Sequence, residues 1–308
     1  MSQNIRNFLL FGALALCPGL WAQVPADVET PDEPVLFTAE AVAKTAKAVN
    51  YRSRSGSTEV DFVGTSLAPR ATGAAEVRNR GAAVEIEATF ENIPDPQDFG
   101  AEYLTNVLWA ISPEGRVSNL GEVQRDRRGR AEMTVTSDLQ VFGMIVTAEP
   151  YYAVRVPSDL IVLENETTER TRGRIFFIDA KYELLQRGAY ESLSNPLNLR
   201  ADTRETPLDI YQARNALAIA RGVGAEDYAA DSLKRAQASL DMANSSVITK
   251  GKEKEVITLA RQAVQFAEDA RALTIERQII EREEHRRQET EAARAAAEEA
   301  APAAESTE

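Results

Sequence analysis

The side chains best suited to acid–base or nucleophilic chemistry are scarce in this chain. Of its 308 residues one is a histidine, His285, and one is a cysteine, Cys17. A Ser–His–Asp triad, a Cys–His pair and a thiolate- or imidazole-rich metal site therefore all lack parts. His285 stands in a run of glutamate and arginine residues, where we expect a solvated side chain. We expect a protein that is not an enzyme and holds no cofactor or metal.

Carboxylates, in contrast, are abundant, with 48 Asp and Glu against 35 Lys and Arg and a formal net charge of −13. Asp95, Asp98 and Glu102 could bind Ca²⁺, but their spacing matches no EF-hand loop, and an ordinary acidic loop is the favoured alternative. Nothing in the sequence places two acids across a cleft, as glycoside hydrolysis requires. The net acidity also argues against a nucleic-acid partner, because phosphates need a basic footprint.

One compact basic cluster consists of Arg125, Arg127, Arg128 and Arg130. It could dock an acidic partner or an envelope phosphate. The alternative, which we favour, is the tip of a hairpin with Gly129 supplying the turn. The four arginines are retained as candidate contacts for a ligand or partner.

Two aromatic residues, Tyr103 and Trp109, could form a stacking platform for a sugar. A tryptophan within an apolar strand is more typical of a sandwich core, and we favour that interpretation. Both residues are kept as candidate ligand contacts beside the arginine cluster.

The elements that must position these residues begin with short strands. Alternation around Val49 and Tyr51, a turn, and renewed alternation at Val60 and Phe62 predict a hairpin. Further strands are predicted at 84–90, 104–111, 117–123, 131–135, 141–148 and 160–163. Short strands separated by frequent turn signals indicate an antiparallel sandwich or barrel. We expect a β-sandwich domain over residues 43–165.

Part of this region resembles a known family. The segments Val107–Arg116 and Ile145–Pro150 resemble the extracytoplasmic β-sandwich of anti-sigma-K-factor proteins, where a W-x-I-x-P-x-G strand-turn and a T-x-E-P strand end recur. The similarity covers residues 100–158 and implies the sandwich fold. The membrane span and sigma-binding part of those proteins are not matched, so sigma-factor binding is not implied.

The second half of the chain is predicted to be helical. A connector at 166–206, with a short helix from Asp179 to Leu193, leads to Thr206 as N-cap and Pro207 as first helical residue. Three stripes of Ala alternating with Leu, Ile or Val follow, and Gly222–Gly224 ends the first helix. Small residues let helix axes approach closely, so we expect an antiparallel three-helix bundle over 207–280.

The helical stripes carry a second resemblance. The segments Ala213–Ala220, Gly224–Leu233 and Leu259–Ala263 resemble a bacterial envelope helical domain of unknown function, with an Ala-rich first helix and a G-A-x-x-Y-A junction. That domain often precedes an OmpA-like peptidoglycan-binding domain. The similarity covers residues 208–275 and implies an envelope location. No OmpA-like segment is seen here, so peptidoglycan binding is not implied, and no catalytic residues are.

Residues 281–308 are predicted to be a charged helix and a disordered tail. The segment up to Ala300 is almost all Glu, Arg, Gln and Ala, with opposite charges one turn apart, as at Glu283 and Arg287. Without an apolar seam a strict coiled coil is not expected. The alternatives are a solvated single helix and a half-disordered one, ended by Pro302.

The N-terminus is predicted to be a signal peptide over residues 1–22. A cationic start, the apolar run Phe8–Leu16 and a Pro-Gly breaker precede Ala22, after which we expect cleavage. Cys17 would leave with it. A flexible linker rich in proline and acids follows at 23–42, and no other stretch is apolar enough to span a membrane. The expected location is periplasmic or secreted.

These observations predict a non-catalytic, exported cell-envelope protein with a structural or adaptor role. Its partners would be an envelope protein, peptidoglycan, or a second copy through the C-terminal helix. The alternative is a ligand-binding β-sandwich that recognises an envelope glycan or peptide. An enzyme is the third hypothesis and would need an acid-only site.

Overall fold

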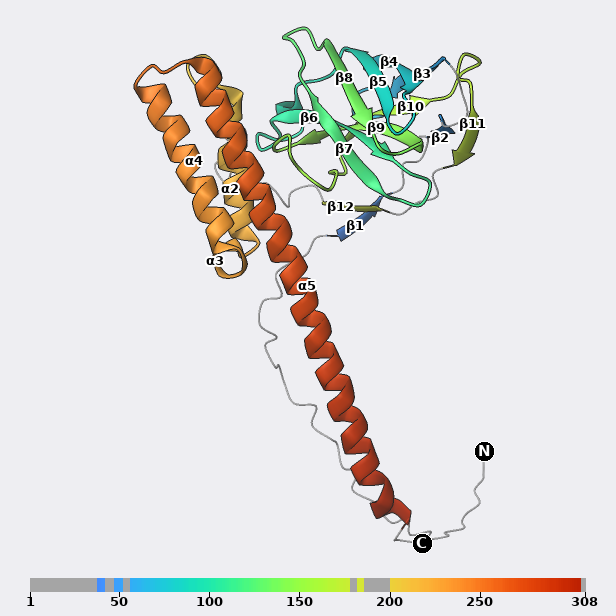
Figure 1. The fold of residues 1–308 in the computed structure, drawn as a ribbon, viewed down its shortest axis with the longest axis vertical. Helices are drawn as coiled ribbons and strands as arrows, with labels where there is room; N and C mark the ends of the chain where they lie inside the picture. The colour runs from blue at the N-terminus through green and yellow to red at the C-terminus, as the bar shows by residue number, and fades with distance from the viewer. Residues whose placement is uncertain (1–37, 42–46, 52–55, 178–181, 186–199, 306–308) are drawn as a thin grey trace, which may run out of the picture. The chain divides into compact units, whose positions relative to one another are not determined.

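The computed structural model describes residues 38–41, 47–51, 56–177, 182–185 and 200–305. The chain divides into two units, Met1–Val35 and Leu36–Glu308, and every described residue belongs to the second. Antiparallel strands come first and helices follow, so the predicted α+β class is confirmed (Figure 1). The predicted signal peptide lies outside the described residues.

Twelve strands are present in the described part of the chain. They are β1 (Thr38–Ala41), β2 (Lys47–Asn50), β3 (Ser57–Gly64), β4 (Thr72–Asn79), β5 (Val84–Glu91), β6 (Thr105–Ile111), β7 (Val117–Val123), β8 (Ala131–Ser137), β9 (Val141–Glu149), β10 (Ile161–Glu166), β11 (Arg174–Phe177) and β12 (Tyr182–Leu185). The strands predicted at 84–90, 104–111, 117–123, 131–135 and 141–148 are confirmed as β5 to β9.

The main sheet is antiparallel and nearly closes on itself. Eight strands follow the order β7-β6-β9-β10-β3-β4-β5-β8, while β2 pairs with the start of β9 and carries β11. The two outermost strands, β7 and β8, contact each other, although no ladder joins them in the described residues. The result resembles a barrel that is open along one seam.

Burial follows strand alternation. In β5, Val84, Ile86, Ala88 and Phe90 are buried and point inward. In β6 every residue is buried, because both faces of this strand are covered. Its even-numbered apolar residues belong to the inner cluster, and its odd-numbered ones belong to a second cluster that includes the helices. The second cluster therefore forms a hydrophobic core that joins the sheet to the helices.

The helices described are α2 (Leu208–Gly222), α3 (Ala225–Tyr228), α4 (Ala230–Ile248) and α5 (Glu253–Glu305). Their predicted inward stripes are buried, as Ala213 and Ala263 illustrate. Gly222 ends α2 as predicted. The predicted cap was wrong, because Pro207 is the N-cap and makes no side-chain cap hydrogen bond.

Two predictions about the connecting segments need correction. The short helix expected from Asp179 to Leu193 is contradicted at Tyr182–Leu185, which form β12, and the rest of it lies outside the described residues. The flexible linker expected at 23–42 is contradicted at Thr38–Ala41, which form β1. The rest of that segment lies outside the described residues. One pairing explains both errors. Strands β1 and β12 pair antiparallel over four residues, and local sequence does not reveal a contact between segments so far apart.

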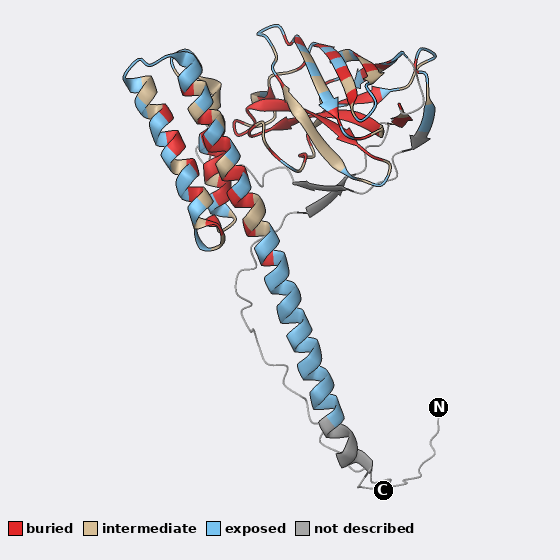
Figure 2. Ribbon diagram, viewed as in Figure 1, coloured by how far each residue is buried: buried red, intermediate tan, exposed pale blue. Residues whose placement is uncertain are grey.

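Helix α5 has two different halves. Its first half packs against α2 and α4, whereas every residue from Glu281 to Glu298 is exposed (Figure 2). A helix of 53 residues extends for about 80 Å at 1.5 Å per residue. No helix in the described part of the chain is long and apolar enough to cross a membrane.

Candidate functional site

The two aromatic candidates lie in the core. Tyr103 and Trp109 are both fully buried. The Trp109 indole Nε1 donates to Thr147 Oγ1 over 2.8 Å, which satisfies its polar group inside the protein. A stacking platform requires an exposed ring face, so the suggestion that these residues contact a sugar is wrong and the core interpretation is confirmed.

The arginine cluster forms the turn between β7 and β8. Asp126 Oδ1 accepts the backbone N–H groups of Arg128 and Arg130 at 2.8 and 2.9 Å. Together with the Arg130 guanidinium, these donors lower the pKa of Asp126 to about 2. Gly129, at φ +76°, supplies the left-handed turn residue. The hairpin-tip interpretation is confirmed.

Arg125 and Arg127 differ in their surroundings. Arg125 Nε donates to the carbonyl oxygen of Ile93 over 3.2 Å, and its side chain is partly buried. Arg127 is exposed, as is Arg128. Only the exposed arginines at this tip are placed to meet a partner.

Two of the acidic candidates, Asp95 and Asp98, share Arg200 as an ion-pair partner. Asp95 caps a short 3₁₀ helix by accepting the N–H of Gln97, and Asp98 pairs with Arg200 at 2.9 Å. Glu102 is buried. No group of three or more potential metal ligands occurs in the residues that the structure describes.

His285 lies on the exposed half of α5. Its Nδ1 is 3.3 Å from Glu289 Oε1 one turn later, and both side chains are solvent-exposed. The expectation of a solvated histidine is confirmed.

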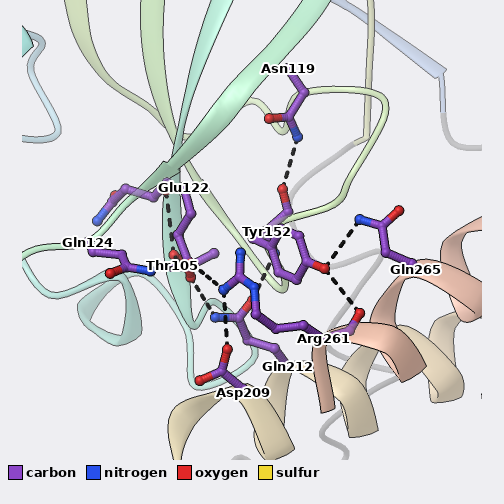
Figure 3. Close-up of polar contacts among 10 residues, drawn as sticks. Thr105, Asn119, Glu122, Gln124, Tyr152, Asp209, Gln212, Arg261 and Gln265 are labelled. Atoms are coloured by element: carbon purple, nitrogen blue, oxygen red, sulfur yellow. Dashed lines mark hydrogen bonds and ion pairs between the residues drawn. The ribbon is translucent and has the colours of Figure 1, made fainter. Parts of the chain in front are cut away.

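A cleft that the sequence did not predict lies where the sheet meets the helices. It has a volume of about 570 Å³ and is bordered by β7, the segment Tyr152–Arg155, and α5 at Arg261 and Gln265. Figure 3 shows the polar contacts around Glu122 and Arg261, two of the residues that line it. Among the sequence candidates, neither the arginine cluster nor the two aromatics line this cleft.

Glu122 of β7 is the centre of these polar contacts. Its Oε1 accepts from Thr105 Oγ1 at 2.8 Å and from Gln212 Nε2 at 2.7 Å, and its Oε2 accepts from Arg261 Nη1 at 2.7 Å (Figure 3). The side chain is only 7% exposed. Glu122 therefore joins β6, β7, α2 and α5 through charge-assisted hydrogen bonds.

Arg261 is held from several sides. Its Nη1 also lies 3.2 Å from Asp209 Oδ1, and its guanidinium carbon is 3.7 Å from the centroid of the Tyr152 ring. Tyr152 OH donates to the Arg261 carbonyl oxygen and accepts from Gln265 Nε2. Stacking and ion pairing together fix the guanidinium in one orientation.

The two carboxyl groups beside Arg261 titrate differently. Burial raises the pKa of Glu122, but hydrogen bonds from Arg261 and Gln212 and the charge of Arg261 outweigh it, so the net pKa is lowered. The pKa of Asp209 is raised, first by burial and then by the charge of Glu122. One guanidinium thus serves two carboxyl groups and favours ionisation of Glu122.

A second polar cluster lies deeper between sheet and helices. Glu268 of α5 accepts from Tyr151 OH at 2.7 Å and from Arg271 at 2.7 and 2.8 Å. It also accepts the backbone N–H of Arg155 at 3.2 Å. Glu268, Arg271 and Tyr151 are all buried. The cluster anchors the segment after β9 to α5.

A third buried acid, Glu149, ends strand β9. Its Oε1 accepts from Thr147 Oγ1 and, at 2.7 Å, from the N–H of Ser158. Its Oε2 has no hydrogen-bond partner in the described structure. Burial raises the pKa of Glu149 to about 8, although hydrogen bonds from Ser158 and Thr147 lower it. This carboxyl group is therefore protonated over much of the neutral range.

Comparisons with known proteins assign no family. No family model, no curated protein and no solved structure matches the chain.

The cleft is lined by hydrogen-bonding side chains, among them Asn119, Glu122, Arg261 and Gln265. Glu122 and Arg261 already satisfy each other, and they orient side chains from β6, β7, α2 and α5. The signal that could have found them is weak, because 139 residues separate the two partners. Local spacing in a single sequence does not report such a pair.

Proposed function

We propose that this protein is an exported, non-catalytic component of a bacterial cell envelope, periplasmic or secreted, that acts as a structural adaptor and associates with itself through helix α5. Residues 1–22 would be its signal peptide, and the mature chain would begin at Gln23. The two folded parts would be a sandwich-type β domain and an antiparallel three-helix bundle built from α2, α4 and α5.

The observation that carries this proposal is the unequal exposure of α5. The first half of the helix supplies core residues such as Ala263 and Ala267, whereas Glu281–Glu298 are exposed throughout. Glu281 accepts a hydrogen bond from Tyr228 OH, but the exposed residues after it gain little from packing, which is the main source of helix stability in proteins. A second helix laid against them would supply that contact.

Two further features support a second copy as the partner. Ile279 and Ile280, at the point where the bundle ends, are 41% and 48% exposed. The segment beyond them mixes glutamates with arginines, so two antiparallel copies could place opposite charges face to face. An envelope protein or peptidoglycan as partner stays a secondary proposal, for which the exposed Arg127 and Arg128 are the available contacts.

Static light scattering of the mature chain and of a chain ending at Ile280 tests the proposal. The full mature chain should show a mass that rises towards that of a dimer with concentration, and the shortened chain should stay a monomer. If both chains are monomers at every concentration, the proposed self-association is wrong. Mass spectrometry of the exported protein checks whether Gln23 is its first residue.

A further inference from the structure

The exposed half of α5 has one face on which charges alternate in sign. At 3.6 residues per turn, residues spaced alternately by four and three positions share a face of a helix. The face that starts at Ile280, which we call the charged stripe, consists of Ile280, Glu284, Arg287, Glu291, Arg294 and Glu298. All of these residues are exposed (Figure 2). Beyond the isoleucine, acids and arginines therefore take turns along the stripe.

The charges of the stripe are not paired with one another. Along residues 281–298, all of which the structure describes, the one ion pair joins His285 to Glu289. At about 100° per residue, these two side chains lie on the far side of the helix from the stripe. The glutamates and arginines of the stripe are therefore free to pair with charges from outside the helix.

The stripe also faces away from the helical bundle. Ala263, Ala267 and Thr274 are buried residues of α5, in the half that packs against α2 and α4. They lie about 100–140° around the helix from the stripe. A helix laid along the stripe can therefore continue past Ile280 without meeting α2 or α4.

The order of the charges fits a second copy in one orientation. In a two-fold pair of parallel helices each residue faces its own counterpart, so glutamate meets glutamate. An antiparallel pair centred on Glu289 instead places Glu284 opposite Arg294 of the second copy. The same register places Arg287 opposite Glu291. Two-fold symmetry repeats both contacts, so every one of these charges meets its opposite.

The exposed isoleucines select the register. A register shifted by about two turns towards the C-terminus also sets acids against arginines, but it places Ile280 opposite Glu305, where α5 ends. In the register described above, Ile279 and Ile280 lie opposite residues 298–299, inside the second helix. Ala295 of the second copy is one turn away. Contact there removes apolar surface from water, which favours this register.

We propose that α5 pairs antiparallel with α5 of a second copy, held by ion pairs of Glu284 with Arg294 and of Arg287 with Glu291. This inference rests on the proposed self-association and adds the orientation and the residues that hold it. Exposed ion pairs contribute little individually and are screened by salt, so the dimer is weak and dissociates as ionic strength rises.

Charge reversal tests which residues hold the two copies together. One variant of the mature chain carries Arg287→Glu and Arg294→Glu, which make the stripe acidic. The other carries Glu284→Arg and Glu291→Arg, which make it basic. In sedimentation equilibrium each variant alone should dimerise at least about tenfold more weakly than the unmodified chain. An equimolar mixture should regain dimers, because opposite stripes then meet, and a folding defect could not be restored in this way.

The matched control carries Arg282→Glu and Arg286→Glu. It changes the net charge as much as the acidic-stripe variant does, but both residues are exposed on the side of α5 away from the stripe. The affinity of the control for itself should change by less than about twofold, because these charges do not face the second copy.

A spin label tests the orientation. Cys17 precedes Gln23, so Ala297→Cys introduces the only cysteine of the mature chain. In the antiparallel register Ala297 lies opposite Glu281, which separates the two labels by about 24 Å along the helix at 1.5 Å per residue. In a parallel pair the labels lie at one level, about 10 Å apart. Electron spin resonance measures this distance.

The outcomes separate this inference from the proposed function. An unmodified chain that is monomeric at every concentration would overturn both. The antiparallel stripe alone would be overturned by a dimer that the stripe variants weaken no more than the control does. Variants that do not recover when mixed, or labels about 10 Å apart, would also overturn it and leave self-association standing.

Discussion

Arg261 of α5 donates through Nη1 to Glu122 Oε2 of β7 over 2.7 Å, and 139 residues separate the two. This pair joins the sheet to the helices where the hydrophobic core reaches the surface. Because Glu122 is only 7% exposed, its loss would leave a partly buried guanidinium beside Asp209 alone.

Glu122→Ala should lower the free energy of unfolding by about 3 kcal/mol, the lower end of what removing one partner of a buried pair costs, because Arg261 is 31% exposed. Urea unfolding followed by circular dichroism measures it. Asp138→Ala, which breaks the exposed pair with Arg116, is the control and should cost less than about 1 kcal/mol. Equal losses in the two variants would mean that the Glu122 network does not anchor the sheet to the helices.

Glu268→Ala should be among the most destabilising single changes in the helices. It removes the buried carboxylate to which Arg271 and Tyr151 OH donate, at about 3–5 kcal/mol. Tyr151→Phe removes one hydrogen bond only and should cost about 1 kcal/mol. Thermal unfolding measures both changes. A Glu268→Ala chain with the same unfolding midpoint as the unmodified chain would show that this cluster contributes no stability.

Gly129→Ala should destabilise the β7–β8 turn more than Gly81→Ala. Both glycines have a positive φ, +76° and +91°, and this strain costs about 1 kcal/mol for alanine. At Gly129 a Cβ would also lie 2.6 Å from the Ile93 carbonyl oxygen, whereas at Gly81 nothing lies within 4 Å. Thermal unfolding of the two variants compares them, and a larger loss for Gly81→Ala would contradict the turn geometry.

The main elements were predictable because their burial is local and periodic. The stripe that includes Ala213 and Ala263 repeats at helical spacing, and β5 alternates. Strand β4 was missed because Gly73, Ala74 and Ala75 give it little strand propensity, and its pairing with β3 and β5 decides its structure. The cleft was missed for a similar reason, since it depends on contacts distant in sequence.

Glu149 should make stability depend on pH between its unfolded and folded pKa values. Its pKa is about 8 in the fold, against an ordinary value of 4.5. The unfolded chain therefore releases this proton first as pH rises, so the stability that Glu149 contributes is full below about pH 4.5 and is lost by about pH 8.

Unfolding of the unmodified chain and of Glu149→Gln, measured at intervals from pH 5 to 9, tests this sign. The amide does not titrate, so the difference in unfolding free energy should shift with rising pH in favour of Glu149→Gln and level off above about pH 8. Parallel curves would show that Glu149 ionises normally in the folded protein.

Sedimentation equilibrium of the mature chain carrying Ile279→Ser and Ile280→Ser tests the central claim most directly. The matched control carries Met242→Ser and Ile248→Ser, which replace two other exposed apolar residues of the helices. If α5 mediates self-association, the unmodified and control chains should form dimers over a micromolar concentration series while the Ile279/Ile280 variant stays monomeric. Self-association through α5 would be contradicted by an unmodified chain that is monomeric throughout, or by a dimer that both pairs of substitutions leave intact.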